Sequence, residues 1–488
     1  MPPIPLARAD EQIVAKREQI LAALARAAPG VSIVSDPAGR RAFETDALTA
    51  YRCPPLAAVL PKSTAETSAV MRFCHENGLR VVARGAGTSL TGGALPTADA
   101  IILGVSRMNR ILEMNFETRT ARVEAGITNL AISNAAAARG FFYAPDPSSQ
   151  LACTLGGNIA MNSGGAHCLK YGVTTNNVLG LTLVAANGDV IELGGQGLDP
   201  AAYDLVGLVV GSEGQFGVVT EATVRILRLP EGARPMLIGF ATAEEAGACV
   251  AAIIARGIIP VAIEYMDKPA IKVCEEFAKA GYPLDVEAML IVEVEGSEDE
   301  IAALLADIAR IADDHGATKV RVSQSAEEAA AIWKGRKSAF GALGRISDYL
   351  CMDGVIPLSR LPDVLRKTND ICDGYGLKVA NIFHAGDGNL HPLIMFDAND
   401  PVQKQKAEDC GAELLKLCVE AGGCITGEHG VGIEKRDLMP VQFTPADLEQ
   451  QMRVKHVFDP DWRLNPGKVF PLAEQAAFQA AERGSEHG

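Results

Sequence analysis

The stretch Arg84-Gly85-Ala86-Gly87-Thr88-Ser89-Leu90-Thr91-Gly92-Gly93 is a glycine-rich turn that follows a short predicted strand at residues 80–83. Small residues at such a turn allow backbone N–H groups to converge on an anion such as pyrophosphate. Gly85 and Gly87 form a G-x-G pair, but the full dinucleotide spacing and the long helix that should follow it are missing. A nicotinamide-binding Rossmann site is therefore disfavoured.

Two further segments repeat the glycine-rich pattern. One runs from Pro145 to Gly165 and contains TLGGN and NSGG, and the other is GSEGQFGVVT at residues 211–220. A single loop of this kind is more often packing than a phosphate site. Three of them between residues 84 and 220 indicate a large ligand that lies close along the backbone.

The 488 residues are enough for two or three domains. Short β-type runs alternate with helical patterns in the first half, which predicts an α+β domain rather than a regular βαβ series. The strands are expected at 101–103, 121–123 and 181–184, and the helices at 65–77 and 130–138. Further on, strands at 261–266 and 288–295 and helices at 243–256 and 298–316 predict a compact sheet with helices on one face. We expect a helical lead-in at 1–50, domains at 51–230 and 231–400, a C-terminal helical segment at 401–470 and a tail at 471–488.

Composition excludes several classes of protein. The net charge of −15 argues against nucleic-acid binding, which needs a basic patch. The 11 cysteines include no C-x-x-C pair, so neither an iron–sulfur cluster nor a zinc ribbon is indicated, and their use fits a reducing cytosol. The longest apolar run, residues 248–263, is shorter than the ~20 residues of a membrane span. Residues 9–28 predict an amphipathic helix rather than a signal peptide, and we expect a cytoplasmic protein.

Two histidine-containing segments in the second half suggest a metal centre. HAGDGNLH places His384 and His391 seven residues apart, and GEHG at 427–430 adds the neighbours Glu428 and His429. Neutral imidazole and carboxylate are ligands for zinc, manganese or iron, and three ligands leave positions open for catalysis. The alternative is a pair of ordinary loop histidines with an N-cap glutamate. The concentration of three of the chain's 8 histidines here favours the metal site.

The order RGAGTSL, TLGGNIAMNSGG and GSEGQFGVVT resembles the FAD-binding domain of the vanillyl-alcohol oxidase flavoprotein superfamily. HAGDGNLH, GEHG and LNPGK at 464–468 narrow the resemblance to the FAD-linked 2-hydroxyacid dehydrogenases. That group includes D-lactate dehydrogenases, D-2-hydroxyglutarate dehydrogenases and the glycolate oxidase flavoprotein subunit. RKSAFGALGRIS at 336–347 and CMDGVIP at 351–357 are most similar to the glycolate oxidase subunit. The resemblance covers about residues 50–470.

The resemblance implies an α+β architecture. A two-part FAD-binding domain would be joined by an antiparallel-sheet cap domain, and C-terminal helices would return to the FAD domain. Some relatives tether FAD to a histidine in the first glycine loop, but Thr88 and Ser89 stand here, so we expect noncovalent FAD. The residues carried over for FAD are Arg84, Gly85, Ala86, Gly87, Thr88, Ser89, Leu90, Thr91, Pro145, Asp146, Gly156, Gly157, Asn158, Asn162, Ser163, Gly164, Glu213, Gly217, Val219, Asn465 and Lys468.

The expected reaction is oxidation of a 2-hydroxy acid by hydride transfer to the flavin. A divalent metal at His384, His391 and Glu428 would lower the pKa of the substrate hydroxyl. We assign His429 as the general base because neutral imidazole titrates near working pH. Arg336 would clamp the substrate carboxylate, since guanidinium forms a planar two-pronged pair with it. Arg345 is a weaker second cation.

Two positions indicate the substrate's size. Hydroxyglutarate enzymes carry a lysine and an asparagine where this chain has Cys351 and Leu393. A buried distal carboxylate would lack partners here, which favours glycolate or D-lactate.

Three alternatives stay open: a D-2-hydroxyglutarate dehydrogenase, a non-catalytic flavoprotein subunit of an oxidase complex, and a metallohydrolase whose glycine loops only pack. Electron-transfer subunits with iron–sulfur clusters are candidate partners. Such partners could attach the protein peripherally to a membrane. The electron acceptor, the metal, the oligomeric state and the particular 2-hydroxy acid are left undetermined.

Overall fold

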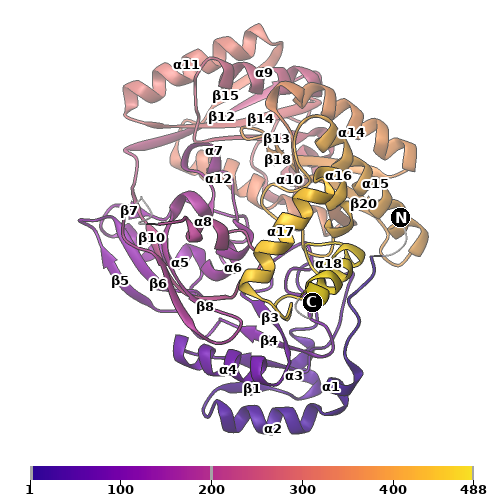
Figure 1. The fold of residues 1–488 in the computed structure, drawn as a ribbon. Helices are drawn as coiled ribbons and strands as arrows, with labels where there is room; N and C mark the ends of the chain where they lie inside the picture. The colour runs from indigo at the N-terminus through magenta and orange to yellow at the C-terminus, as the bar shows by residue number, and fades with distance from the viewer. Residues whose placement is uncertain (1–3, 198–201, 486–488) are drawn as a thin grey trace. The chain divides into compact units, whose positions relative to one another are not determined.

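The structure, a computed structural model, describes residues 4–197 and 202–485 (Figure 1). The chain groups into two compact units. We call Gly164–Gly172 together with Leu229–Gly427 the central unit, and the described parts of Pro2–Ser163, Val173–Arg228 and Glu428–Gly488 the flanking unit. Among the described residues, no helix has the length and apolar character needed to span a membrane.

The flanking unit contains two main sheets. In the first, strands β2, β4 and β3 run parallel, and β1 is antiparallel to β2 at one edge. The second is antiparallel throughout. In sheet order, the strands are β1 (Ser32–Val34), β2 (Ala57–Leu60), β4 (Ala100–Gly104) and β3 (Arg80–Arg84), then β5 (Ile111–Asn115), β6 (Thr120–Glu124), β10 (Val218–Arg225), β8 (Val178–Val184) and β9 (Val190–Gly194). A small pair joins β7 (Phe141–Phe142) to β11 (Leu227–Arg228).

Helices of the flanking unit begin at polar caps. Ser63 caps α4, and Thr154 caps α6 by accepting a hydrogen bond from the backbone N–H of Gly157. Such caps satisfy N–H groups that the first helical turn leaves without partners. The helices are α1 (Glu11–Ala15), α2 (Arg17–Ala27), α3 (Pro37–Arg41), α4 (Thr64–Glu76), α5 (Asn129–Ala137), α6 (Leu155–Met161), α8 (Leu205–Val209), α16 (Met439–Gln442), α17 (Pro445–Phe458) and α18 (Leu472–Ser485).

The central unit is built on one large antiparallel sheet. Its main path is β15 (Ala317–Val322), β12 (Gly232–Phe240), β14 (Ala288–Gly296), β13 (Ala262–Asp267), β18 (Lys378–His384), β19 (Asn389–Leu390) and β17 (Gly354–Val355). Off this path, β20 (Pro392–Phe396) pairs with β18, and β16 (Asp348–Cys351) pairs with β20. Its helices are α7 (Cys168–Tyr171), α9 (Ala243–Ala255), α10 (Lys268–Ala278), α11 (Glu298–Asp314), α12 (Ala326–Lys337), α13 (Ala339–Leu343), α14 (Leu361–Tyr375) and α15 (Pro401–Glu420).

The two faces of this sheet differ in chemistry because side chains alternate along a strand. Ile263, Tyr265 and Phe383 point to one face, where they form the main core with α9, α11 and α14. Each fully buried side chain of this size contributes about 1.5–3 kcal/mol. Glu264 and His384 therefore point to the other face, where α12 contributes the partner of Glu264. The expectation of helices on one face only is wrong, because polar strand residues give α12 a second docking surface.

Most predicted strands and helices of both units are confirmed within a few residues. Three boundaries differ from the expectation. Residues 472–485, expected as a tail, form α18. Helix α15 belongs to the central unit, because its Leu417 and Cys418 lie in that unit's core. The short segment Gly164–Gly172 also groups with the central unit, which no feature of the sequence had indicated.

Candidate active site

His384 lies at the end of β18, directly opposite Glu264 on β13. Its Nδ1 is 2.7 Å from Oε1 of Glu264. Burial raises the pKa of Glu264, but Arg336 and His384 outweigh burial and hold it below its ordinary value. Beside this carboxylate, Nδ1 of His384 is the donor, which leaves Nε2 on the side of the ring away from Glu264. This is the arrangement in which a carboxylate orients a metal-binding imidazole.

The ring of His391 is also oriented by a hydrogen bond at Nδ1. Its buried ring places Nδ1 3.2 Å from the backbone carbonyl of Met352. Because a carbonyl oxygen can only accept, Nδ1 is the donor. The His384 and His391 rings lie 5.3 Å apart between centroids at 87°. The central unit thus brings the two imidazoles that were predicted as metal ligands together.

The glycines between these histidines are required by the tight turn. Gly388 has a φ of +78°, and a Cβ there would lie 2.2 Å from the carbonyl oxygen of Ile356. The backbone N–H of Asn389 donates to the carboxylate of Asp387, 3.1 Å away, across the same turn. A side chain at residue 388 would therefore strain the turn and clash with the backbone of Ile356.

The segment before Glu428 is anchored within the central unit. The backbone N–H of Gly427 donates to the carboxylate and to the carbonyl of Asp353, each at 3.0 Å, and Thr426 Oγ1 donates to that carboxylate at 2.6 Å. A Cβ on Gly427 would lie 2.5 Å from Oδ1 of Asn389. Because consecutive Cα atoms are about 3.8 Å apart, the anchored Gly427 limits the positions that the backbone of Glu428 can occupy.

Glu428 and His429 begin the last segment of the flanking unit. Oε1 of Glu428 lies 3.9 Å from Nε2 of His429, and both side chains are mostly buried. The carbonyl of His429 accepts a hydrogen bond from Oγ1 of Thr91 at 3.2 Å. This contact links the predicted base to the first glycine loop.

Arg336 lies in the last turn of α12 and is buried. Its Nε donates to Oε2 of Glu264 at 2.7 Å. One terminal nitrogen also lies 2.5 Å from that oxygen, but outside hydrogen-bond geometry, so it has no hydrogen-bond acceptor among the described residues. Glu264 was missed by the sequence analysis. The available signal was a single glutamate inside the apolar strand VAIEYM at 261–266.

The three glycine loops converge within the flanking unit. A Cβ on Gly85 would lie 2.2 Å from Oγ1 of Thr154, so the first loop packs directly against the start of α6. Asn465 joins the first and third loops, because its Oδ1 accepts from the N–H of Ala83 at 3.1 Å and its Nδ2 donates to the carbonyl of Glu213. The predicted FAD residues of residues 84–91, 156–163 and 213–219 therefore form one neighbourhood.

Several predicted cofactor residues also stabilise this neighbourhood. The buried carboxylate of Glu213 accepts from the N–H groups of Val431 and Gly432 at 2.7 and 2.8 Å. Burial raises the pKa of Glu213. Asn162 ends α6 in the left-handed conformation, with a φ of 52°. Asn129 donates to the carbonyl of Pro145 and to Oδ1 of Asn158. Gly164 is the one predicted cofactor residue that groups with the central unit.

Lys468 provides a test of whether the site fits an anionic cofactor. Its side chain is 2% exposed, and its Nζ has no hydrogen-bond partner among the described residues. Burial lowers the pKa of Lys468 to about 7, opposed by Asp46 and Glu213. A buried ammonium without a hydrogen bond is costly, and an anionic ligand would relieve that cost. This environment fits a cofactor that carries phosphate groups or a polarised flavin ring.

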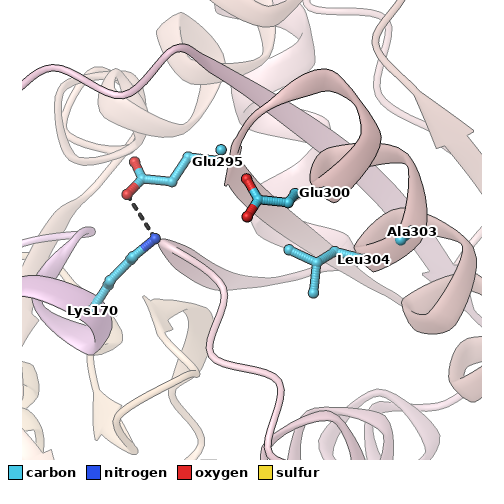
Figure 2. A pocket seen from close by; sticks show the side chains of 6 residues that line it. Lys170, Glu295, Glu300, Ala303 and Leu304 are labelled. Carbon is cyan, nitrogen blue, oxygen red and sulfur yellow. Dashed lines mark ion pairs between the residues drawn. The ribbon is translucent and has the colours of Figure 1, made fainter.

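The central unit also has an open pocket of about 490 Å³ (Figure 2), lined by Lys170, Glu295, Gly296, Glu300, Ala303 and Leu304. Nζ of Lys170 lies 2.8 Å from Oε1 of Glu295, as the dashed line in Figure 2 marks. Glu300 belongs to the capping box of α11. None of the predicted site residues lines this pocket.

The class of protein follows from the fold and from two family models. A model described as "FAD binding domain" matches residues 55–194, and one described as "FAD linked oxidases, C-terminal domain" matches residues 229–469. Two solved structures share the fold. The 4-ethylphenol oxidase from Gulosibacter chungangensis has a TM-score of 0.77 at 17% identity over 96% of this chain and 100% of its own. p-Cresol methylhydroxylase has a TM-score of 0.78 at 16% identity over 96% and 99%.

The relatives narrow the class further. "Glycolate oxidase subunit GlcD" of Escherichia coli (strain K12) is 47% identical over 94% of this chain and 93% of its own. GlcD of Bacillus subtilis (strain 168) is 39% identical over 89% and 93%. "D-lactate dehydrogenase" of Archaeoglobus fulgidus is 34% identical over 84% and 90%. The chain belongs to the FAD-linked oxidases of the vanillyl-alcohol oxidase flavoprotein family, and it is an oxidoreductase with an FAD-binding domain.

Proposed function

We propose that the protein oxidises a small D-2-hydroxy acid, glycolate or D-lactate, to the 2-oxo acid. The observation that carries the proposal is the buried network of His384, Glu264 and Arg336. It joins an imidazole that donates through Nδ1 to a buried guanidinium, one of whose terminal nitrogens has no hydrogen-bond acceptor among the residues that the structure describes. A metal-binding group and a carboxylate-binding group side by side match a substrate whose hydroxyl and carboxylate are adjacent.

We assign a divalent metal to His384, His391 and Glu428, and FAD to the flanking unit. When bound, FAD supplies hydride acceptance, and the metal supplies Lewis-acid activation of the substrate hydroxyl. Arg336 holds the C1 carboxylate in a two-pronged pair, which orients the substrate's C2. His429 takes the hydroxyl proton at a ring nitrogen, as the general base.

FAD is held without a covalent bond in this proposal. The first glycine loop offers Thr88 and Ser89 rather than a histidine. Arg84 to Thr91 would bind the pyrophosphate, and Glu213, Gly217 and Val219 would lie on the adenine and ribose side. The residues that would line the flavin and ribityl chain are Pro145, Asp146, Gly156, Gly157, Asn158, Asn162, Ser163 and Gly164. Asn465 and Lys468 close the site. The buried ammonium of Lys468, which has no hydrogen-bond partner in the described part of the chain, supports its part in this assignment.

The names of the relatives support the choice of substrate. They describe glycolate oxidase subunits and D-lactate dehydrogenases. Because the glycolate oxidase relatives are named as subunits, we further propose that this chain passes its electrons to partner subunits.

The test is anaerobic reduction of the purified flavoprotein by a panel of 2-hydroxy acids, followed at the flavin absorbance. Bleaching by glycolate or D-lactate is expected. A flavoprotein that no 2-hydroxy acid reduces would refute the proposal and favour a non-catalytic subunit. A colourless protein that hydrolyses esters or amides with bound metal would favour a hydrolase.

A further inference from the structure

Glu264 is the common partner of two proposed functional groups that come from different elements. It lies on β13, is fully buried, and faces the side of the sheet opposite the main core. Oε1 accepts from Nδ1 of His384 at 2.7 Å, and Oε2 accepts from Nε of Arg336 at 2.7 Å. Each carboxylate oxygen therefore serves one partner.

The division of oxygens has a geometric consequence. A carboxylate is planar and rigid, so the direction of one hydrogen bond restricts the direction of the other. The cross-strand pairing of Glu264 with His384 sets the carboxylate on the sheet, and α12 brings Arg336 to its remaining oxygen. The ring plane of His384 and the orientation of the Arg336 guanidinium are consequently linked through one side chain.

We propose that Glu264 is a positioning residue that fixes the metal-binding tautomer of His384 and the orientation of Arg336 together. It touches neither substrate nor cofactor in this scheme and acts through those two residues. The inference rests on the proposed function for the substrate role of Arg336, whereas the effect on metal binding can be measured without turnover.

Replacing the carboxylate by an amide separates the two tasks. In Glu264→Gln, the single amide oxygen can accept from only one partner side. If it accepts from Arg336, the amide NH₂ faces Nδ1 of His384, which then accepts, and the proton moves to Nε2. If it accepts from His384, the amide NH₂ faces the guanidinium, and donor meets donor. One function is lost in either orientation.

The experiment measures metal affinity by equilibrium dialysis of Zn²⁺ and Mn²⁺ against the flavin-loaded protein, beside KM and kcat for glycolate. Glu264→Gln should weaken metal affinity by about 10–100-fold, the usual effect of losing a partner that orients a ligand. If the amide oxygen instead keeps the hydrogen bond from His384, KM should rise while metal affinity is retained. Wild-type metal affinity and wild-type KM in a folded Glu264→Gln protein would overturn the proposal.

Glu295→Gln is the matched control. Glu295 is also an ion-paired glutamate on the same sheet, but its partner is Lys170 at the pocket of Figure 2. It should leave metal affinity and KM within about twofold. An equal loss of metal affinity in this control would mean that any ion-paired glutamate of the sheet has the same effect, which would also overturn the specific role of Glu264.

Glu264→Asp keeps the test valid if the glutamine variant does not fold. Aspartate preserves the charge beside Arg336 but is one methylene shorter, so it cannot keep both hydrogen bonds at their present lengths. A loss of metal affinity is expected, and unchanged affinity would refute the positioning role. A wild-type protein inert toward every hydroxy acid would instead refute the proposed function and leave the metal-binding result to stand alone.

Discussion

Cys351 on β16 and Leu393 on β20 are directly opposite Cα partners across antiparallel strands. Opposite side chains on such strands point to the same face and lie close together. Both side chains are buried, so the two residues form one apolar neighbourhood, which we propose to face the substrate. In that proposal, the second carboxylate of a dicarboxylic substrate would meet a thiol and an isobutyl group there.

This pairing predicts the substrate preference. Glycolate and D-lactate should reduce the flavin faster than D-2-hydroxyglutarate, because burying an unpaired carboxylate against Cys351 and Leu393 is costly. Stopped-flow reduction rates with the three acids measure the order. A fastest rate with hydroxyglutarate would show that Arg345 or another cation holds the distal carboxylate.

Alanine at His384, His391 or Glu428 should remove the metal and the activity together. Each residue supplies one of three proposed ligands, and a site with two ligands holds a divalent ion weakly. Metal content by elemental analysis, with flavin content measured on the same sample, separates this effect from loss of fold. Full activity in a metal-free preparation of the wild-type protein would contradict the metal's role.

His429→Asn should slow flavin reduction by about 10²–10⁴-fold, the usual contribution of a general base, with little change in substrate binding. Asparagine keeps the approximate shape of the ring but cannot accept a proton near neutral pH. Single-turnover reduction rates over a range of glycolate concentrations separate the rate from the affinity. An unchanged limiting rate would assign the proton to another group.

Arg336→Lys should weaken substrate binding more than it slows the chemical step. The charge is kept, but the planar fork is lost, and a hydrogen bond between charged groups contributes about 1.5–3 kcal/mol. We expect the substrate Kd to rise by about 10-fold or more. A variant with normal Kd and slowed reduction would place Arg336 in transition-state stabilisation instead.

Lys468 predicts a pH dependence of the apoprotein's stability. Its pKa is lowered to about 7 by burial, so between about pH 7 and the ordinary lysine pKa the folded apoprotein binds fewer protons than the unfolded chain. The free energy of unfolding attributable to Lys468 therefore rises with pH across this window. Apoprotein Lys468→Met should be more stable than wild type at pH 6, on the order of a few kcal/mol, and the difference should shrink toward pH 10.

Lys468→Met should also bind FAD more weakly, because methionine lacks the positive charge that would pair with an anionic cofactor. Denaturant unfolding of both apoproteins at several pH values, with FAD titration at pH 6, provides the two readouts. A variant less stable than wild type at pH 6 would show that the charge is already compensated in the apoprotein.

Acid precipitation of the holoprotein should release the flavin into the supernatant, and flavin retained on the denatured chain would contradict noncovalent binding.

The local structure could be predicted from the sequence alone. The glycine loops at 84–93 and 211–220 follow from steric demands that a side chain cannot meet, and these demands are visible in the residue types. Alternation and helical periodicity predicted strands such as 288–295 and helices such as 298–316 because both patterns repeat within a few residues. The grouping of two histidines around a glycine turn likewise comes from neighbouring residues.

The tertiary structure decided the contacts between residues far apart in the chain. Glu264 meets Arg336 and His384 across sequence separations of 72 and 120 residues, and no periodicity connects them. The sequence could not predict that Nζ of Lys468 is buried without a hydrogen-bond partner among residues 4–197 and 202–485, because that depends on which residues surround it in the folded chain. Local patterns report which face of an element is apolar, but they do not report which elements meet. The partner of a buried charge is therefore set by packing, since burial makes such a pairing necessary while leaving the choice of partner to the fold.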